Sequence, residues 1–296
     1  MAGTKEIKTH IQSVQETKKI TSVMYLIAST KLRRARQELD NTRPYFQSIQ
    51  REIKRIFRTA GDVDSHYFYP VDNDTPREGT YACLVITADK GLAGSYNQNA
   101  IKEAIRLLEQ HTDTKLFVVG EYGRRFFASH DIPIEHSFLY TAQNPTMSRA
   151  REISALLLDG FDRGELKEIF IVYTDMANAM SFETRSTRLL PFHRSSFATP
   201  PGERIVKEPF EFLPDAQTVL NSMMFSYVSG FIYSALIDSF CCEQNARMTA
   251  MDSANRNAEG LLGELSLQYN RVRQSAITQE ITEVSAGARA QRQQKR

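Results

Sequence analysis

The chain has 296 residues, of which 41% are hydrophobic and 24% charged, and its formal net charge is +2. A hydrophobic fraction near the globular average excludes a largely disordered protein. Three cysteines are too few for a disulfide framework, so we expect a reducing compartment. The small net charge of the whole chain argues against a strongly basic nucleic-acid binder, and we expect no nucleic acid among its partners.

The charge is distributed unevenly. Residues 1–60 hold 13 Lys and Arg against 5 Asp and Glu, a net of +8, whereas residues 61–79 have a net of −4. The remaining blocks, 80–214 and 215–296, have net charges of −2 and 0. These boundaries predict an N-terminal coiled-coil helix, an acidic linker, a central α/β domain and a C-terminal coiled-coil helix, in that order.

A long N-terminal helix is predicted from about residue 4 to about residue 58, because apolar side chains recur alternately every three and four residues. Of the 15 positions with this spacing, 12 are apolar or aromatic, which is typical of a coiled-coil seam. Pro44 interrupts the pattern and predicts a local kink. The seam consists of Ile7, Ile11, Val14, Lys18, Thr21, Tyr25, Ala28, Leu32, Ala35, Leu39, Thr42, Phe46, Ile49, Ile53 and Ile56.

The same helix has a second apolar face beside the seam, made by Ile20, Val23, Met24 and Ile27. A helix that is apolar on two faces is expected to be buried on both. One partner helix covers only one of them, so something else must cover the second.

Residues 80–214 change to alternating strands and helices. The apolar run 82–87 predicts a strand buried on both faces, and a glycine-containing loop, 89–97, follows it. This order predicts an α/β fold, a Rossmann-like domain with a mainly parallel sheet. The remaining expected elements are helices 98–110, 121–129 and 148–160, strands 116–119 and 168–173, and a further strand, 187–192, that could lie antiparallel at an edge.

A second long helix is predicted from about residue 215 to about residue 288, because no proline follows Pro214. It contains 22 uncharged residues, 216–237, which is long enough to span a bilayer. Seven of them are polar, however, so we expect a helix buried in protein, a soluble chain and no direct membrane span. Its seam shows best in Ala258, Leu262, Leu265, Tyr269, Val272 and Ala276.

Two long amphipathic helices at opposite ends of a chain are most simply paired as a long antiparallel coiled coil. The C-terminal helix is the longer, so its end is expected to extend beyond the pair. An apolar stripe on that tip, made by Ile277, Ile281, Val284 and Ala288, needs a partner. The pattern therefore predicts a shaft whose tip and second apolar face lie inside another protein.

Motifs for chemistry are weak. The loop Gly91–Gly94 lies where a dinucleotide loop would lie but matches neither the dinucleotide fingerprint nor the phosphate loop, so we expect a turn capped by Ser95 or Asn97. The six His have no metal-ligand spacing, and the Cys241–Cys242 pair favours packing. We predict no catalytic residue, no cofactor and no metal. A nucleotide-binding or dehydrogenase-like enzyme and a coiled-coil adaptor are the alternatives at this point.

The sharpest basic cluster is the run 31–36, Lys-Leu-Arg-Arg-Ala-Arg. A solvated helix face is its ordinary interpretation. Attraction to an acidic partner surface is the functional one, and it is favoured because the run directly follows the doubly apolar stretch. Nucleic acid is less favoured, since no aromatic platform accompanies the run.

The chain resembles the gamma-subunit family of F-type ATP synthases over nearly its whole length, and three blocks carry the resemblance. The first extends from Lys5-Glu-Ile through Ile20-Thr-Ser-Val-Met24 to Lys31-Leu-Arg-Arg-Ala35. The second is Ile86-Thr-Ala-Asp-Lys-Gly-Leu-Ala-Gly94. The third and most specific is Glu243-Gln-Asn-Ala-Arg-Met-Thr-Ala-Met-Asp252, with Tyr269-Asn270 and Gln274-Ser-Ala-Ile-Thr-Gln-Glu280.

The resemblance implies a central rotor shaft without an active site. In this family the coiled coil lies inside a ring of three alpha and three beta subunits, and catalysis takes place on beta. The shaft couples ion flow through the membrane ring to ATP synthesis or hydrolysis. The α/β domain lies beside the epsilon subunit and the membrane c-ring. The implied location is the cytoplasmic face of the bacterial plasma membrane, as a peripheral part of the complex.

The resemblance also implies partner contacts for particular residues. Those expected to face the acidic loops of beta are Met24, Lys31, Arg33, Arg34 and Arg36. Those expected to make polar contacts to the ring nearer the tip are Arg247, Arg273, Gln274, Thr278, Glu280 and Glu283. Those expected to rest on the membrane ring are Phe210, Glu211, Phe212 and Pro214. The paired-cysteine insert of the chloroplast form is absent from 183–205, so no thiol switch is expected.

Overall fold

The computed structural model describes residues 3–60, 63, 65–69, 78–139, 142–176, 182–197 and 211–294. The chain divides into two compact units, of which one comprises residues 1–28 and 248–296 and the other Ser29–Arg247. Two long helices, α1 (Thr4–Ala60) and α5 (Ala216–Gln294), each contribute residues to both units. The four-part division of the chain by charge stays a prediction.

Both long helices confirm the prediction from apolar spacing. Every one of the 15 seam positions of α1 is buried or half-buried, although 3 of them are not apolar. The helix continues through Pro44, so the proline does not end it. In α5 an 18-residue window has a mean hydropathy of 1.2, and 67% of that window is buried inside the structure, as expected for a helix that packs on protein.

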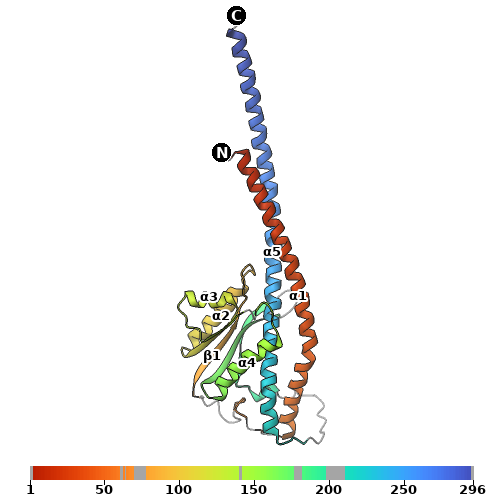
Figure 1. Ribbon diagram of the computed structural model, residues 1–296, viewed down its shortest axis with the longest axis vertical. Helices are drawn as coiled ribbons and strands as arrows, with labels where there is room; N and C mark the ends of the chain where they lie inside the picture. The colour runs from red at the N-terminus through yellow and green to blue at the C-terminus, as the bar shows by residue number, and fades with distance from the viewer. Residues whose placement is uncertain are drawn as a thin grey trace. The chain divides into compact units, whose positions relative to one another are not determined.

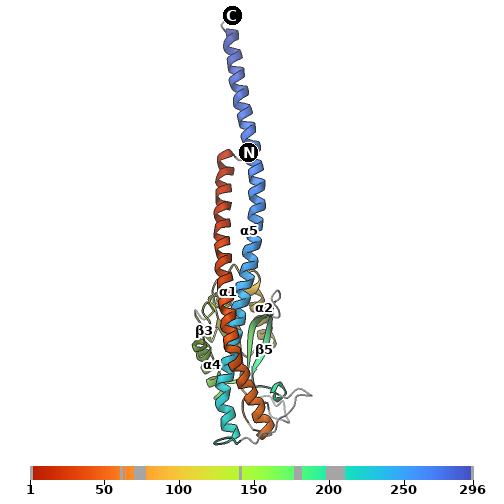
Figure 2. The same ribbon diagram turned by 90° about the vertical axis from the view of Figure 1, so that its right-hand side faces the viewer.

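A β-sheet lies within Ser29–Arg247 (Figures 1 and 2). It has five strands in the order β3-β2-β1-β4-β5. The first four strands are parallel, and β5 is antiparallel to β4 at the edge, as predicted. The strands are β1 (Thr80–Ile86), β2 (Thr114–Val119), β3 (His136–Phe138), β4 (Leu166–Met176) and β5 (Phe182–Leu190). The short strand β3 was not predicted, because three residues carry no periodic signal.

Helices cover both faces of this sheet. One face packs on α2 (Tyr96–Gln110) and α3 (Glu121–Ser129), where Val85 and Val118 meet Ile101 and Phe127. The helix α4 (Met147–Asp162) packs against β4. Residues 82–86 of β1 are at most 1% exposed, which explains why this strand appears in the sequence as an unbroken apolar run.

In the same unit, α5 lies between α1 and the sheet (Figure 1). Toward the sheet, the backbone N–H of Thr174 donates to Ser239 Oγ at 3.2 Å. Toward α1, the rings of Phe46 and Tyr233 lie 6.4 Å apart. A short 3-10 helix, η1 (Arg194–Phe197), brings Phe197 against α1. The N-terminal part of α5 is thus enclosed on two sides, and this accounts for its apolar composition.

In the unit made of residues 1–28 and 248–296, α1 and α5 form an antiparallel pair. Lys18 Nζ lies 2.8 Å from Glu259 Oε1, and Thr21 Oγ1 donates to Asn255 Oδ1 at 2.5 Å. The residue number rises on one helix as it falls on the other, which is the direction that the two seams predicted.

Candidate partner-binding surfaces

The closed seam defines which faces of α1 are left for partners. In residues 3–28 the seam side chains turn toward α5, and Ile7 is only 3% exposed. The neighbouring apolar side chains do not: Ile20, Val23, Leu26 and Ile27 are 50–63% exposed. Such a contiguous exposed apolar row is typical of a protein interface. The expected second apolar face is therefore present, and Met24 lies half-buried at its margin.

The basic run lies on the solvent side of α1. Leu32 and Ala35 belong to the seam and are buried, which leaves Lys31, Arg33 and Arg34 exposed. Arg34 Nε lies 3.1 Å from Glu38 Oε1, an exposed pair that contributes little to stability. Arg36 is also exposed. The run therefore presents several cations on one stretch of helix.

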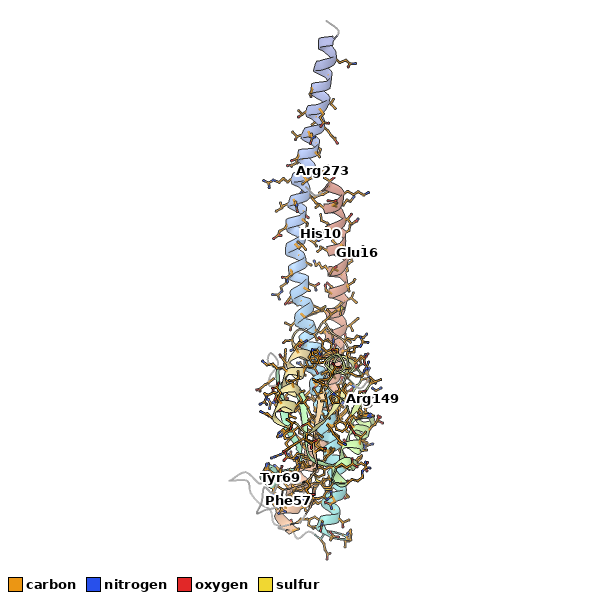
Figure 3. All side chains as sticks on the ribbon, turned by 90° about the vertical axis from the view of Figure 1, so that its left-hand side faces the viewer. His10, Glu16, Phe57, Tyr69, Arg149 and Arg273 are labelled. Atoms are coloured by element: carbon orange, nitrogen blue, oxygen red, sulfur yellow. The ribbon has the colours of Figure 1, made fainter. Side chains whose placement is uncertain are left out.

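The C-terminal part of α5 extends past the start of α1 within its own unit, and Figure 3 shows Arg273 at this level. Ile281 and Val284 are 62% and 73% exposed, and no described residue covers them. The polar residues that the resemblance assigned to this region are all exposed and follow on one helix, namely Arg273, Gln274, Thr278, Glu280 and Glu283. Their contact with a partner stays a prediction.

Arg247 differs from the other candidate contacts because it is only 9% exposed. Its Nη1 donates to Glu243 Oε1 at 2.5 Å, and its Nη2 donates to the carbonyl oxygen of Gly91 at 3.0 Å. Its guanidinium is thus occupied inside the unit. This contact could not be predicted from the sequence, since Gly91 and Arg247 lie 156 residues apart.

The candidate membrane-ring segment is described in part. Phe210 lies outside the described residues. Glu211 and Pro214 are exposed, Phe212 is half-buried, and the neighbouring Leu213 is 82% exposed. The segment directly precedes α5, and its contact with a membrane ring also stays a prediction.

The loop after β1 is built for packing. Ser95 occupies the N-cap of α2 but makes no side-chain capping bond, and Asn97 Oδ1 instead accepts the backbone N–H of Ala88 at 2.9 Å. The prediction that one of these side chains caps the helix was therefore wrong. Ala88, Ala93 and Tyr96 form a buried cluster with residues of α5. This cluster packs the loop against α5. Among the described residues, no cluster of His, Cys, Asp and Glu is placed to hold a metal ion.

One buried titratable group in this unit, Asp238, could not be predicted from the sequence. Burial raises the pKa of Asp238 to about 6 from its ordinary value of 3.8, and Asp175 raises it further, whereas Arg43 lowers it. The charges around Asp238 come from three elements. Arg43 lies on α1 and Asp175 lies on β4. Asp175 is itself paired with Arg185 of β5, at 3.3 Å.

We expect Asp238→Asn to stabilise the chain at pH 7. Between about pH 4 and pH 6 the folded chain keeps a proton that the unfolded chain has lost, so stability falls as pH rises through this window and stays lower above it. The asparagine has no charge to bury. Urea unfolding at pH 4, 5, 6 and 7 checks this, with the exposed Asp159→Asn as control. Equal stability of variant and wild type at pH 7 would contradict it.

Comparisons with known proteins agree with this architecture. A family described as ATP synthase matches residues 3–291. An ATP synthase gamma chain from Acetivibrio thermocellus is 39% identical over 295 residues, covering 98% of this chain and 99% of the relative. One from Acetobacterium woodii, named sodium ion specific, is 35% identical over 303 residues, covering 96% and 97%.

Solved structures show the same fold. A chain of the Euglena gracilis mitochondrial ATP synthase, in a structure of OSCP, F1 and the c-ring, has a TM-score of 0.64 at 18% identity and covers 98% of this chain and 96% of that one. A chain of the Tetrahymena thermophila mitochondrial ATP synthase central stalk and c-ring has a TM-score of 0.56 at 23% identity, covering 79% and 99%.

Proposed function

Because the chain belongs to the ATP synthase gamma chain family, we propose that it is the central rotor shaft of an F-type ATP synthase. The gamma chain is a non-catalytic subunit of a membrane-associated complex. The observation that carries the proposal is the combination on α1 of a closed seam toward α5 with an exposed apolar row, Ile20 to Ile27. A coiled coil without partners needs only the closed seam, whereas a shaft inside a ring of other subunits needs both the seam and the exposed apolar row.

The finer assignment follows from the surfaces. Three alpha and three beta subunits surround the coiled coil, and the apolar row lies against the inside of their ring. Apolar contact is non-directional, so it seals the ring on the shaft without fixing an angle. The epsilon subunit and the membrane c-ring bind the α/β layer, at the cytoplasmic face of the bacterial plasma membrane. Ion flow turns the shaft, and the beta subunits change conformation as its faces pass.

Charged side chains supply the angular dependence that apolar contact lacks. The cations facing the acidic loops of beta are Lys31, Arg33, Arg34 and Arg36, with Met24 beside them. The polar contacts nearer the tip are Arg273, Gln274, Thr278, Glu280 and Glu283. Attraction between opposite charges fixes register, so a given beta subunit is favoured at a given angle.

Co-purification tests the shaft. The full chain carrying an affinity tag is expressed with the alpha and beta subunits, and we expect a stable complex with ATPase activity. An adaptor of unrelated complexes would leave alpha and beta in the unbound fraction. An enzyme on the α/β layer would instead bind ATP or NAD stoichiometrically in equilibrium dialysis of the full chain, which we do not expect.

Reversing two charges of the basic run tests the angular contacts. We expect Arg33→Glu/Arg34→Glu to fold and assemble, because both side chains are exposed, but to lose most of the ATP-driven ion pumping in reconstituted vesicles. The reason is repulsion where attraction is proposed. The control Arg151→Glu/Arg163→Glu makes the same charge change on exposed positions at α4. Undiminished pumping in the first variant would reject the proposed contacts.

A further inference from the structure

A buried charge cluster joins α5 to the loop between β1 and α2. Besides its bonds to Glu243 and to the carbonyl of Gly91, Arg247 Nη2 donates to the carbonyl oxygen of Lys90 at 3.4 Å. The side chains of Arg247 and Glu243 are only 11% and 8% exposed. Charge-assisted hydrogen bonds that are buried away from water hold their partners in one orientation.

The surroundings of this cluster are rigid. Ala93 and Tyr96 pack on Cys242 and Ala246, one helical turn apart on α5. The loop itself is braced by the bond from the Ala88 N–H to Asn97 Oδ1. Packing therefore holds both α5, which carries Arg247, and the loop whose carbonyl oxygens accept its bonds.

Charges from three elements meet at Glu243. Burial raises its pKa above the usual range, Asp89 of the loop raises it further, and Arg247 of α5 and Lys31 of α1 lower it. Asp89 in turn accepts the backbone N–H of Glu121, the first residue of α3, at 2.9 Å through Oδ1. The cluster thus connects both long helices with the loop and, through Asp89, with α3.

The covalent connections between the long helices and the sheet are single stretches of chain, 61–79 and 191–215. Torque between the sheet layer and the helices also passes through side-chain contacts. Besides the bond from the Thr174 N–H to Ser239 Oγ, Arg247 makes two directional contacts of this kind, to the carbonyl oxygens of Lys90 and Gly91.

We propose that Arg247 and Glu243 form a torsional clamp that fixes the α/β layer to the shaft. The inference rests on the proposed function, since it concerns how a rotor passes torque within itself. Arginine suits the task because its planar fork binds a carboxylate and two carbonyl oxygens at once, which the point charge of lysine does not. The clamp also gives Arg247 a role inside the chain in place of contact with the surrounding ring.

The test measures torsional stiffness in the assembled complex of alpha, beta and this chain. The ring is immobilised, and a bead is attached through Glu109→Cys on the exposed side of α2. The native cysteines of this chain are buried, and burial raises the pKa of Cys83 to about 12, so labelling within this chain is confined to the new thiol. Angular fluctuation of the bead during pauses gives the stiffness. The variants are Arg247→Lys and Glu243→Gln, with Arg163→Lys as control for an exposed pair, since Arg163 and Asp159 are about 60% exposed.

We expect both clamp variants to lose stiffness and to pump fewer ions per ATP in vesicles, whereas ATPase activity of the complex without its membrane ring stays at the wild-type level. The control keeps wild-type stiffness. Unchanged stiffness in variants that fold and assemble would overturn the clamp. So would a fall in the ATPase activity of the ring-free complex at unchanged stiffness, because Arg247 would then act on the ring. Failure of the wild-type chain to assemble would instead reject the proposed function.

Discussion

Replacing Ile53 by alanine should lower the free energy of unfolding of the full chain by about 2–5 kcal/mol, the usual range for truncating a buried isoleucine. Ile53 is 0% exposed and lies on the seam of α1. The variant loses the burial of the removed methyl and methylene groups and leaves a cavity between two helices whose backbones cannot close it fully. Urea unfolding of wild type and variant gives the difference directly.

The matched control is Ile20→Ala on the same helix. Ile20 is 61% exposed, and a change there should stay within about 0.5 kcal/mol in the isolated chain. If Ile20→Ala destabilises the isolated chain as much as Ile53→Ala does, the division of α1 into a closed seam and an exposed apolar row is wrong. In the assembled complex, the two substitutions should differ less in their effect on stability, because the exposed apolar row is proposed to be covered there.

A methyl group added at Gly230 should destabilise the chain by about 1–3 kcal/mol, the range for overpacked cores. The added Cβ would lie 1.8 Å from Cε1 and 2.0 Å from Cδ1 of Phe46, far inside contact distance. The aromatic ring must turn away, and a groove of ≈ 290 Å³ lined by Phe46, Leu39 and Tyr227 gives it somewhere to go. That space keeps the cost below that of a clash with backbone.

The control for Gly230→Ala is Gly260→Ala on the same helix. No atom lies within 4 Å of a Cβ at Gly260, so the change should stabilise the chain by about 0.5–1 kcal/mol through helix propensity. Thermal unfolding of the two variants checks this: we expect a lower melting temperature than wild type for Gly230→Ala and a higher one for Gly260→Ala. In Gly230→Ala/Phe46→Leu, part of the lost stability should return, because the smaller side chain vacates the position of the methyl group. If the double variant is no more stable than Gly230→Ala, the loss of stability does not come from a clash with Phe46.

The helical parts of the fold were predictable because their signals are long. A seam of 15 positions averages over the exceptions Lys18, Thr21 and Thr42, which the structure leaves half-buried in a seam that is otherwise buried or half-buried. Parallel strands such as β1 were also predictable, because burial on both faces leaves an unbroken apolar run. The edge strand β5 was expected at 187–192 but begins earlier, at Phe182, since an edge strand need not be apolar.

Some residues of the candidate surfaces could be predicted from the sequence, and others could not. Arg33 was assigned from the basic run and the family resemblance, and Ile281 from helix periodicity. The structure leaves both side chains exposed. The burial of Arg247 was not predictable, because its partners Lys90 and Gly91 come from a distant loop and bind through backbone carbonyls. Gly230 was missed for a related reason, since a glycine inside a helix does not say which ring will occupy the space it leaves.

The order of the elements along the chain has a consequence for synthesis. The seam of α1 is complete in the nascent chain at Ala60, whereas its partner α5 begins at Ala216, with the whole sheet between them. At about 5–20 residues per second, the ribosome needs roughly 8–30 s to cover that interval. For this time an amphipathic helix with an unpaired apolar stripe is exposed to other nascent chains and to chaperones. The strands of the sheet lie close together in sequence, so the sheet can fold before α5 is synthesised. It then provides the surface on which α5 packs.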